Sequence, residues 1–428
     1  MNNADIAIIG GGLTGLTAAI RAAEQGHHVD LYEAAPQLGG RTRSFFHQPS
    51  QTWVDHGPHL LIGVYERTLQ LLQEIDALKN TTWQKSLTLP LWDAKRGHFE
   101  LKASPHLPFP LALIHAVQQM PGHGWAMIPS LLRMAYSLKK NSMKEGQTKT
   151  VAEWMQSANI QRPLQRDMIE VLCLGAMNEA MDTADAASFS HVLQQAFANH
   201  RNARLGWFTK PLSHALIEPL MQRCMALGVH IHTSSRVLSL QSNHQGCTLT
   251  TRSATSTYEK IVLATPPSIR NKLLNIQQTI ATSPITNVHL WFEQTTTLSS
   301  PFIGGIDTYG QWFFDVSHQF NQNTADKHTL SHLCAVISAD KSKRSKQEKV
   351  HLIINELRSI TGDKHLDARH YQITTVQAAT HLVRPSIALL LPDRLIDACE
   401  QPALGELPAT IESAIVRGEQ AAIKISDN

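Results

Sequence analysis

A glycine-rich turn between a predicted strand and a predicted helix is the feature that most constrains this chain. Residues 6–9 are a run of apolar residues typical of a short buried strand, and apolar residues recur at helical spacing over 13–23. In the turn between them, Gly10 permits a sharp change of direction, Gly12 lets the backbone approach a diphosphate, and Gly15 lets the helix pack against the strand. This arrangement predicts a unit that binds a dinucleotide.

The chain after this turn supplies two more groups for the same task. A diphosphate would rest on the free N–H groups at the start of the helix, at Leu13 and Thr14, where the helix dipole is positive. Residues 29–33 read as a second strand, and Glu33 follows Gly15 by 18 residues, where a carboxylate that binds a ribose hydroxyl belongs. A glycine turn with its acid in register predicts a Rossmann-type fold.

A second glycine pair narrows the choice of dinucleotide. The segment GGRTRS at residues 39–44 resembles the GGRxxS motif of FAD-dependent amine oxidases and carotenoid-type desaturases. In those proteins the backbone and the arginine approach the phosphates of FAD. The resemblance implies that FAD is the cofactor and that Gly40, Arg41 and Thr42 contact it.

Composition excludes several classes of protein. With 428 residues the chain is long enough for two domains, and its net charge of +3 is too small to indicate nucleic-acid binding. Its 23 histidines show no HExxH or Cys-His ligand spacing, so no metal site is predicted. The five cysteines are scattered, which favours a reducing compartment, and no run of about 18 apolar residues could span a bilayer. We expect a cytoplasmic protein, either soluble or peripheral on the inner face of the membrane.

Strand and helix patterns place the cofactor domain in three separate parts of the chain. We assign residues 1–80, 212–268 and 385–428 to a discontinuous FAD-binding domain. Residues 81–211 look mainly helical and residues 269–384 mix strands with one helix, so both are assigned to a substrate-binding domain. The predicted fold class is α/β: a Rossmann-type FAD-binding domain of the amine-oxidase-like (GR2) kind, interleaved with an α+β substrate domain.

Several further segments resemble one family, the squalene-associated FAD-dependent desaturases, whose activity is hydroxysqualene dehydroxylation. The run VDHGPHLLIG at 54–63 is similar to its D-N-G-Q-H-x-x-x-G element, with His56 and Pro58 in place of the usual Asn and Gln. The runs TNVHLWF and QWFFD are similar to its N-x-H-L-W-F and Q-W-x-F-D strands. The other similar blocks lie at residues 174–178, 188–193, 384–385 and 407–414.

The resemblance implies a reaction on a polyprenyl lipid. The hydroxyl group of hydroxysqualene would be replaced by hydrogen to give squalene, a precursor of hopanoids and other triterpenoids, with hydride supplied by reduced FAD. This direction requires an external electron donor, which the sequence does not identify. Three alternatives remain open: a carotenoid- or phytoene-type FAD-dependent desaturase or isomerase, a flavin amine oxidase, and a non-catalytic FAD-fold protein that binds a lipid.

More cofactor contacts are implied by the same resemblance. They are Gly57, Pro58, Val237, Glu400, Ala409, Thr410 and Ile411. One departs from the family pattern, because Ala398-Cys399-Glu400 stands where the family has A-G-D. Glu400 could replace the Asp with one more methylene, but Cys399 adds a Cβ atom where the backbone comes close to the cofactor. Either this loop shifts or the contact is lost.

Two residues are candidates for the acid that protonates the leaving oxygen. His59 follows a Gly-Pro turn in a segment that lies near the flavin in relatives, and the ordinary pKa of histidine suits proton transfer near neutrality. Its alternative role is a hydrogen bond to the backbone or the cofactor. Asp315 ends an aromatic strand, and burial there would raise its pKa. Its alternative role is to cap the strand end or to pair with a cation.

The expected substrate pocket is apolar and aromatic. Its candidate residues are Asn178, Trp291, Trp312 and Phe314. Aromatic faces attract cations, which suits a carbocationic reaction. Alternate residues of a strand point to opposite faces, however, so ordinary core packing is the competing interpretation for each of them.

Residues 107–140 are apolar, broken by prolines and followed by lysines. A helix of this kind suits the interface of a membrane with anionic headgroups, and we expect weak peripheral association through it. A buried core helix with a basic, solvated end is the alternative.

Overall fold

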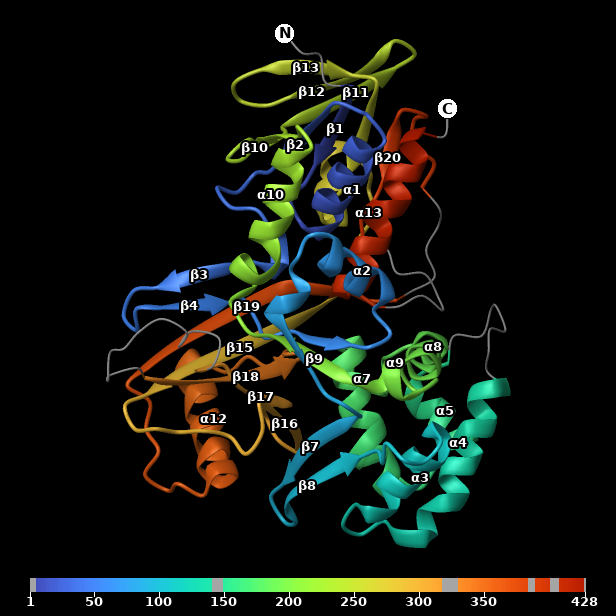
Figure 1. The fold of residues 1–428 in the computed structure, drawn as a ribbon, viewed down its shortest axis with the longest axis vertical. Helices are drawn as coiled ribbons and strands as arrows, with labels where there is room; N and C mark the ends of the chain where they lie inside the picture. Colours follow the sequence, from blue (N-terminus) through green and yellow to red (C-terminus); the bar gives the residue numbers. More distant parts are fainter. Residues whose placement is uncertain (1–4, 141–148, 318–329, 384–388, 401–407, 427–428) are drawn as a thin grey trace.

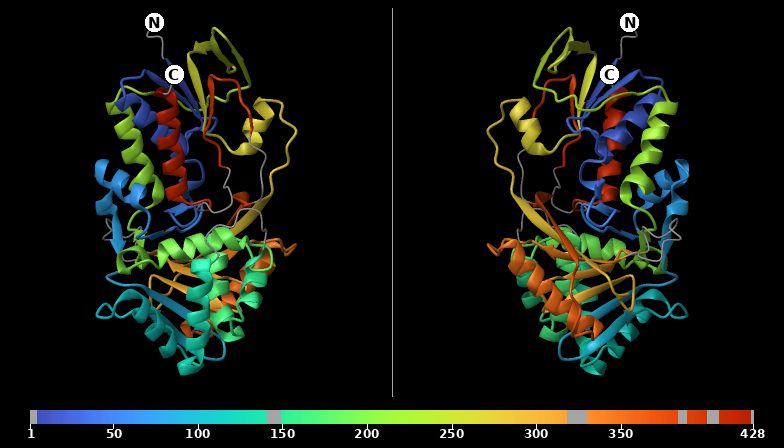
Figure 2. Two further views of the ribbon diagram at one scale, coloured as in Figure 1. Left: turned by 90° about the vertical axis from the view of Figure 1, so that its right-hand side faces the viewer. Right: turned by 90° about the vertical axis from the view of Figure 1, so that its left-hand side faces the viewer.

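The computed structural model describes residues 5–140, 149–317, 330–383, 389–400 and 408–426 (Figures 1 and 2). Its first sheet has five parallel strands in the order β10-β2-β1-β14-β20. These strands are β1 (Ile6–Ile9), β2 (Val29–Tyr32), β10 (His230–His232), β14 (Lys260–Leu263) and β20 (Leu395–Asp397). One sheet therefore draws its strands from the beginning, the middle and the end of the chain.

Alternation along β1 explains why both faces of this sheet are covered. Ile6 and Ile8 share a core with three helices that lie side by side in Figure 2, α1 (Leu13–Glu24), α10 (Glu218–Ala226) and α13 (Ile411–Ser426). Ala7 and Ile9 point the other way, into a core with a small antiparallel sheet. Its strands are β11 (Ser239–Asn243), β12 (Gly246–Thr250) and β13 (Thr255–Tyr258). The first sheet is thus a layer between helices and a second, smaller sheet.

A larger mixed sheet of seven strands lies below the first in Figure 1, in the order β19-β15-β18-β17-β16-β7-β8. Neighbouring strands are antiparallel except β16 and β7, which are parallel. The strands are β7 (Thr88–Asp93), β8 (Gly97–Lys102), β15 (Thr282–Phe292), β16 (Phe302–Ile306), β17 (Trp312–Asp315), β18 (Ser331–Ser338) and β19 (His370–His381). Helix α12 (Lys346–Thr361) packs on one face, against alternate residues of β15, β17 and β18.

The opposite face of this sheet contributes to a core with a group of helices. They are α3 (Phe109–Gln119), η3 (Gly124–Met127), α4 (Ile128–Lys140), α5 (Val151–Ser157), α6 (Arg162–Leu164), η4 (Gln165–Ile169), α7 (Glu170–Met177), α8 (Ala186–Ala196) and α9 (His200–Ala203). Among the described residues, no helix is both long and apolar enough to cross a bilayer.

Shorter elements connect the two sheets. The hairpin of β3 (Ser44–His47) and β4 (Thr52–Asp55) lies against the larger sheet, as Figure 1 shows. A three-stranded sheet joins β5 (Leu60–Ile62), β9 (Leu205–Phe208) and β6 (Thr81–Trp83). The remaining elements are η1 (Gly40–Thr42), α2 (Glu66–Glu74), η2 (Leu78–Asn80), η5 (Ser213–Ile217) and α11 (Pro267–Leu273).

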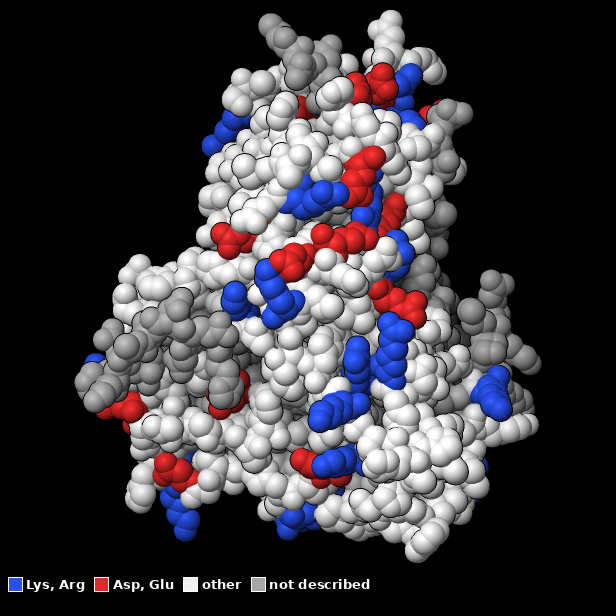
Figure 3. Space-filling model, viewed as in Figure 1, with Lys and Arg blue, Asp and Glu red and all other residues white. Residues whose placement is uncertain are grey.

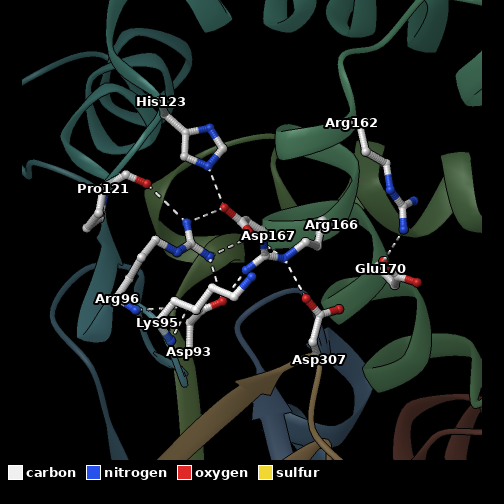
Figure 4. A network of polar contacts seen from close by, with 10 residues as sticks. All are labelled: Asp93, Lys95, Arg96, Pro121, His123, Arg162, Arg166, Asp167, Glu170 and Asp307. Atoms are coloured by element: carbon white, nitrogen blue, oxygen red, sulfur yellow. Dashed lines mark hydrogen bonds and ion pairs between the residues drawn. The ribbon is translucent and has the colours of Figure 1, made fainter.

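A buried ion-pair network fixes the helices to the turn between β7 and β8 (Figure 4). The carboxylate of Asp167 accepts hydrogen bonds from both terminal nitrogens of Arg96, at 2.6 and 2.9 Å, and lies 2.7 Å from Nε2 of His123. Asp93 pairs with Arg96 and Arg166. Burial raises the pKa of Asp167, but the bonds with His123 and Arg96 outweigh it and lower that pKa to about 2. This network is structural, because its charges are paired with one another.

The parallel sheet and the mixed sheet match the two kinds of domain predicted from the sequence. The division at residues 80, 212, 268 and 385 stays a prediction. The similar blocks at 384–385 and at Leu407 lie outside the described residues.

Candidate cofactor and substrate site

The first glycine turn has three positions with different steric demands. A Cβ atom on Gly10, which has φ of +113°, would lie 2.4 Å from the carbonyl oxygen of Ala264, and one on Gly15 would lie 1.8 Å from that of Gly10. These two positions require glycine for the fold itself. A Cβ on Gly12 would meet nothing within 4 Å. The open space at Gly12 is therefore where a bound group can approach the backbone.

Helix α1 begins directly after this open space. Gly12 is its N-cap, and no side chain caps the helix there. The N–H groups of the first turn, which include those of Leu13 and Thr14, have no partner within an α-helix. They form a ready site for a diphosphate.

One hydrogen bond joins the second glycine turn to the first, and another closes the second turn itself. The N–H of Gly39 donates to the carbonyl of Gly11 at 2.8 Å, and the hydroxyl of Thr42 donates to the carbonyl of Gly39 at 2.7 Å. A Cβ on Gly40, which has φ of +56°, would lie 3.4 Å from Cα of Gly12. The two turns thus approach closely at Gly12 and Gly40, where neither has a side chain.

Glu33 lies at the end of β2, and its carboxylate holds this loop in place. One oxygen accepts from the N–H of Gly11 at 2.8 Å and the other from that of Ala35 at 2.7 Å. Each carboxylate oxygen has a second lone pair, so a ribose hydroxyl could still donate to it. The predicted ribose contact is compatible with this geometry and stays a prediction.

Arg41 and Glu400 form an ion pair that joins the second glycine turn to the last part of the chain. Arg41 also donates to the carbonyl of Ala379 at 2.6 Å. The Glu400 carboxylate lies 3.1 Å from Nδ1 of His381. Burial raises the pKa of Glu400, but His381 and the charge of Arg41 outweigh it and lower that pKa to about 2. Glu400 is therefore ionised and occupied by protein partners.

Cys399 does not obstruct the cofactor side of this loop. Its thiol lies 3.3 Å from the carbonyl of Leu263 in β14, and its side chain belongs to the core beneath the small sheet. In the structure the Glu400 carboxylate is bound to Arg41 and the Cys399 side chain is turned inward, and the predicted contact of Glu400 with the cofactor stays a prediction. Val237 lies in the same core.

The start of α13 carries the last predicted cofactor contacts. Thr410 and Ser413 cap one another: the N–H of Thr410 donates to the hydroxyl of Ser413 at 2.9 Å, and the N–H of Ser413 donates to the hydroxyl of Thr410 at 3.0 Å. One of the three expected donors, the N–H of Thr410, is therefore already engaged. Those of Ala409 and Ile411 stay predicted contacts.

The turn at residues 56–59 lies against the larger sheet. The carbonyl of His56 accepts hydrogen bonds from Asn287 at 2.7 Å and from Thr374 at 2.8 Å. A Cβ on Gly57 would lie 2.9 Å from the amide of Asn287, so a larger residue here would have to displace that side chain. Pro58 follows in the same turn. Sequence reasoning did not identify Asn287 as the residue that supports the turn.

His59 has one ring nitrogen engaged by this turn. Its Nδ1 lies 2.8 Å from the carbonyl of Gly57, which fixes that nitrogen as the donor and leaves Nε2 for proton transfer. Burial lowers the pKa of His59; the bond to Gly57 opposes this and the charge of Arg41 adds to it. The ring is therefore neutral at neutral pH, and it must take up a proton before it can give one.

Strand register places Asp315 on the opposite face of the larger sheet from Trp312 and Phe314. Trp312 and Phe314 of β17 belong to the core on the helical face of the larger sheet, whereas Phe313 belongs to the core with α12. Asp315 has the parity of Phe313 and is paired with Leu333 of the same α12 core. Its carboxylate accepts from the N–H of Ser317 at 3.1 Å. Asp315 thus faces away from Trp312 and Phe314, so we do not retain it as a proton donor.

The other two predicted pocket residues are held by protein partners. The amide of Asn178 donates to the hydroxyl of Thr380 at 3.0 Å and to the carbonyl of Ser283 at 3.3 Å, and its oxygen accepts from the N–H of Ala339 at 2.7 Å. This geometry makes Asn178 a clamp at the end of α7, where its φ is +53°. These bonds engage both ends of the amide, so a structural role competes with the predicted substrate contact, which stays a prediction.

Trp291 lies between two imidazoles. The rings of His47 and His332 stack on it, each with a centroid distance of 4.3 Å, and its indole N–H donates to Thr52 at 3.2 Å. It joins the β3–β4 hairpin to the larger sheet. Of the four predicted pocket residues, Trp312 and Phe314 belong to one apolar core, and strand register turns Trp291 to the same face of the sheet.

His332 of this stack also belongs to a buried pair of histidines, which sequence reasoning did not identify. Nδ1 of His289 lies 3.1 Å from Nε2 of His332, and Nε2 of His289 lies 3.8 Å from the thiol of Cys334. Burial, and then the charge of neighbouring histidines, lowers the pKa of His289 to about 3 and that of His332 well below its usual range. Both rings are neutral. The described residues include no group of three or more side chains suited to a metal ion.

The sequence of this chain matches the model of a known protein family. The model of the family described as flavin containing amine oxidoreductase matches residues 13–384. The chain belongs to this family. It is therefore an FAD-dependent oxidoreductase, and the predicted fold class and cofactor are confirmed. The open space at Gly12, the uncapped start of α1 and the paired glycine turns fit FAD, and they are the groups that would hold its diphosphate.

Three relatives show the range of this family. The hydroxysqualene dehydroxylase of Zymomonas mobilis is 24% identical, over 97% of each chain. The 15-cis-phytoene desaturase of Arabidopsis thaliana is also 24% identical, over 68% of this chain and 54% of its own. The solved structure of cyclohexylamine oxidase from Brevibacterium oxydans is 17% identical, with a TM-score of 0.69 over 99% of both chains. The last comparison shows the fold alone.

Proposed function

We propose that the chain catalyses the reductive dehydroxylation of hydroxysqualene to squalene. The observation that carries this proposal is the likeness to hydroxysqualene dehydroxylase, which covers 97% of both chains and so includes both sheets. Reduced FAD would supply the hydride. The C–O bond of the substrate breaks, the oxygen leaves as water after protonation, and the carbon gains the hydride, so that one two-electron oxidation of the cofactor balances one reduction of the lipid.

The residues of this chain have defined tasks in the proposal. The turns around Gly12 and Gly40 bind and orient the cofactor, with Arg41 held at their edge by Glu400. Trp312 and Phe314 present aromatic faces to the hydrocarbon chain and to the positive charge that develops when the oxygen leaves. The apolar core around them excludes water.

His59 would handle the proton. Its Nε2 is the free ring nitrogen and its Nδ1 is fixed by Gly57. Since its lowered pKa keeps the ring neutral, it must first accept a proton and then pass it to the leaving oxygen. A low pKa makes the protonated ring a stronger acid, but it also lowers the fraction of the protein in which the ring is protonated.

A carotenoid- or phytoene-type desaturase is the second candidate, and two observations favour it. The phytoene desaturase of Arabidopsis is equally identical to this chain over the part that it matches. A neutral His59 is also better prepared to accept a proton than to give one, as an oxidative reaction requires. A flavin amine oxidase is supported by fold alone.

Anaerobic turnover separates these functions. The FAD-loaded protein, reduced chemically and mixed with hydroxysqualene in detergent micelles, should reoxidise its flavin and yield squalene in equal amount. The oxidised protein mixed with phytoene should keep its flavin oxidised. Flavin reduction by phytoene, with no squalene from hydroxysqualene, would replace the proposal by the desaturase.

His59→Gln tests the proton step in the same assay. It keeps a polar side chain of similar size but has no titratable nitrogen, so squalene formation should slow while flavin content stays the same. A variant with the full rate would remove His59 from the mechanism.

A further inference from the structure

The outer face of α4 is apolar where a surface helix is usually polar. Pro129, Leu132 and Tyr136 are exposed at helical spacing, and Trp125 is exposed one turn before them in η3. The exposed fractions are 79% for Trp125, 68% for Tyr136 and 56% for Leu132. We name these four residues the α4 stripe. Large aromatic and aliphatic side chains so exposed in one row mark a binding surface.

The inner face of the same helix is apolar as well. Leu131 and Met134 are buried in the core that also contains Trp312 and Phe314, and Met127 of η3 joins them. The α4 stripe is therefore an additional apolar face and not the core-facing side of an ordinary amphipathic helix. The neighbouring helix α3 extends this face with Leu111, which is 54% exposed.

The segment of the chain that carries the α4 stripe has charges of one sign. The chain has no Asp or Glu between Glu100 and Glu145, and it has five Lys or Arg residues in that interval. Lys139 is exposed at the end of the stripe. The surface that Figure 3 shows over α3 is mostly white, without acidic side chains. An apolar surface with a basic margin complements an anionic lipid bilayer.

We propose that the α4 stripe and Leu111 dock this protein on an anionic membrane surface, with α4 lying in the plane of the interface. Trp125 and Tyr136 have the amphipathic rings that favour the headgroup level, and Leu132 inserts between them into the acyl boundary. Lys139 faces the anionic headgroups. A second copy of the chain is a poorer occupant, because two such surfaces would bring like charges together.

The docked orientation would also serve a lipid substrate. One continuous apolar core extends from the inner face of α4 to Trp312 and Phe314 of the larger sheet. This core offers a hydrocarbon chain a route along apolar side chains from α4 toward the predicted pocket. Docking itself does not rest on the proposed function, since it requires only the surface.

Vesicle flotation of the FAD-loaded protein tests the docking. Vesicles of phosphatidylcholine with phosphatidylglycerol at low salt should carry the protein, and vesicles of phosphatidylcholine alone should carry less. The double variant Trp125→Ser, Leu132→Gln should lower the partition coefficient by about tenfold or more, because two large apolar side chains no longer enter the bilayer. Lys139→Glu should weaken binding to the anionic vesicles only.

Ile423→Gln is the matched control, because Ile423 is 57% exposed on α13 and lies outside the proposed surface. It should bind like the unchanged protein. Equal binding by the double variant, or equal loss in the Ile423 variant, would overturn the proposal. So would dimers that the double variant abolishes without any vesicle binding, which would assign the surface to a second copy. The assay needs no turnover, so its failure is separate from failure of the dehydroxylase reaction.

Discussion

Arg41 and Glu400 lie 359 residues apart in the chain and form an ion pair beside the second glycine turn. The pair joins the first part of the chain to the last, and His381 adds a third segment through the same carboxylate. It occupies the place where the sequence departs from the family pattern. We therefore regard Glu400 as the residue that positions Arg41.

Removing the charge of Glu400 should loosen this junction. The pKa of Glu400 is lowered from 4.5 to about 2, so the pair contributes stability above pH 4.5 and loses it as the pH falls toward 2. Glu400→Gln should lower the free energy of unfolding at neutral pH by about 2 kcal/mol, a value reduced from the full shift because Arg41 is half exposed. Denaturant unfolding across this pH range measures the effect, and the two proteins should converge at low pH.

Glu293→Gln serves as the control for that experiment. Glu293 pairs with Arg369 at 2.5 Å, but both side chains are largely exposed, so its removal should change stability little. Equal destabilisation by the two variants would show that the buried position of Glu400 has no special role.

Replacement by alanine should have different effects at Gly12, before α1, and at Gly15, within α1. In Gly12→Ala the new methyl group points into open space, so the protein should fold normally but lose FAD affinity by about tenfold or more, since the methyl enters the diphosphate position. In Gly15→Ala the methyl would lie 1.8 Å from a backbone oxygen, so the fold itself should fail. Circular dichroism and flavin titration distinguish these outcomes. Normal FAD binding by Gly12→Ala would place the diphosphate elsewhere.

Asn178 should be important for stability and not for substrate contact. Asn178→Ala removes four side-chain hydrogen bonds within the protein and keeps a left-handed backbone, so the free energy of unfolding should fall by about 2–4 kcal/mol. Asn275→Ala is the control, because Asn275 has φ of +54° and is exposed. The difference between them isolates the hydrogen bonds. A raised KM with unchanged stability would instead restore Asn178 to the substrate site.

The sequence was sufficient to predict those features of the fold that depend on residues close together in the chain. A glycine turn between a strand and a helix depends on backbone torsions and on neighbours within a few residues, and Glu33 follows at a fixed spacing. These features could be predicted because short-range geometry determines them. The assignment of FAD depended on the second glycine pair, which the structure places against the first.

Strand register and contacts between residues far apart in the chain could not be predicted from the sequence. Asp315 and Phe314 are adjacent in the chain, and only the pairing of β17 with β18 decides which of them faces α12. The His289–His332 pair likewise forms across β15 and β18, and its members are 43 residues apart. Periodicity also could not separate the two faces of α4, because both are apolar. Only the exposed fractions of the side chains in the structure show which face of α4 is buried.

The opposite faces of β17 offer the sharpest test of the substrate site. Trp312 packs toward the helical core, where a Cβ on Gly175 would approach its ring within 3.1 Å, and Phe313 packs toward α12. Both changes, Trp312→Leu and Phe313→Leu, remove an aromatic ring from a buried position and should destabilise the protein by about 1–3 kcal/mol. Only Trp312→Leu should raise the KM for the lipid and lower kcat, because only that ring faces the proposed pocket. Steady-state kinetics on folded, FAD-loaded samples checks this, and similar kinetic losses in both variants would show that β17 acts through stability alone.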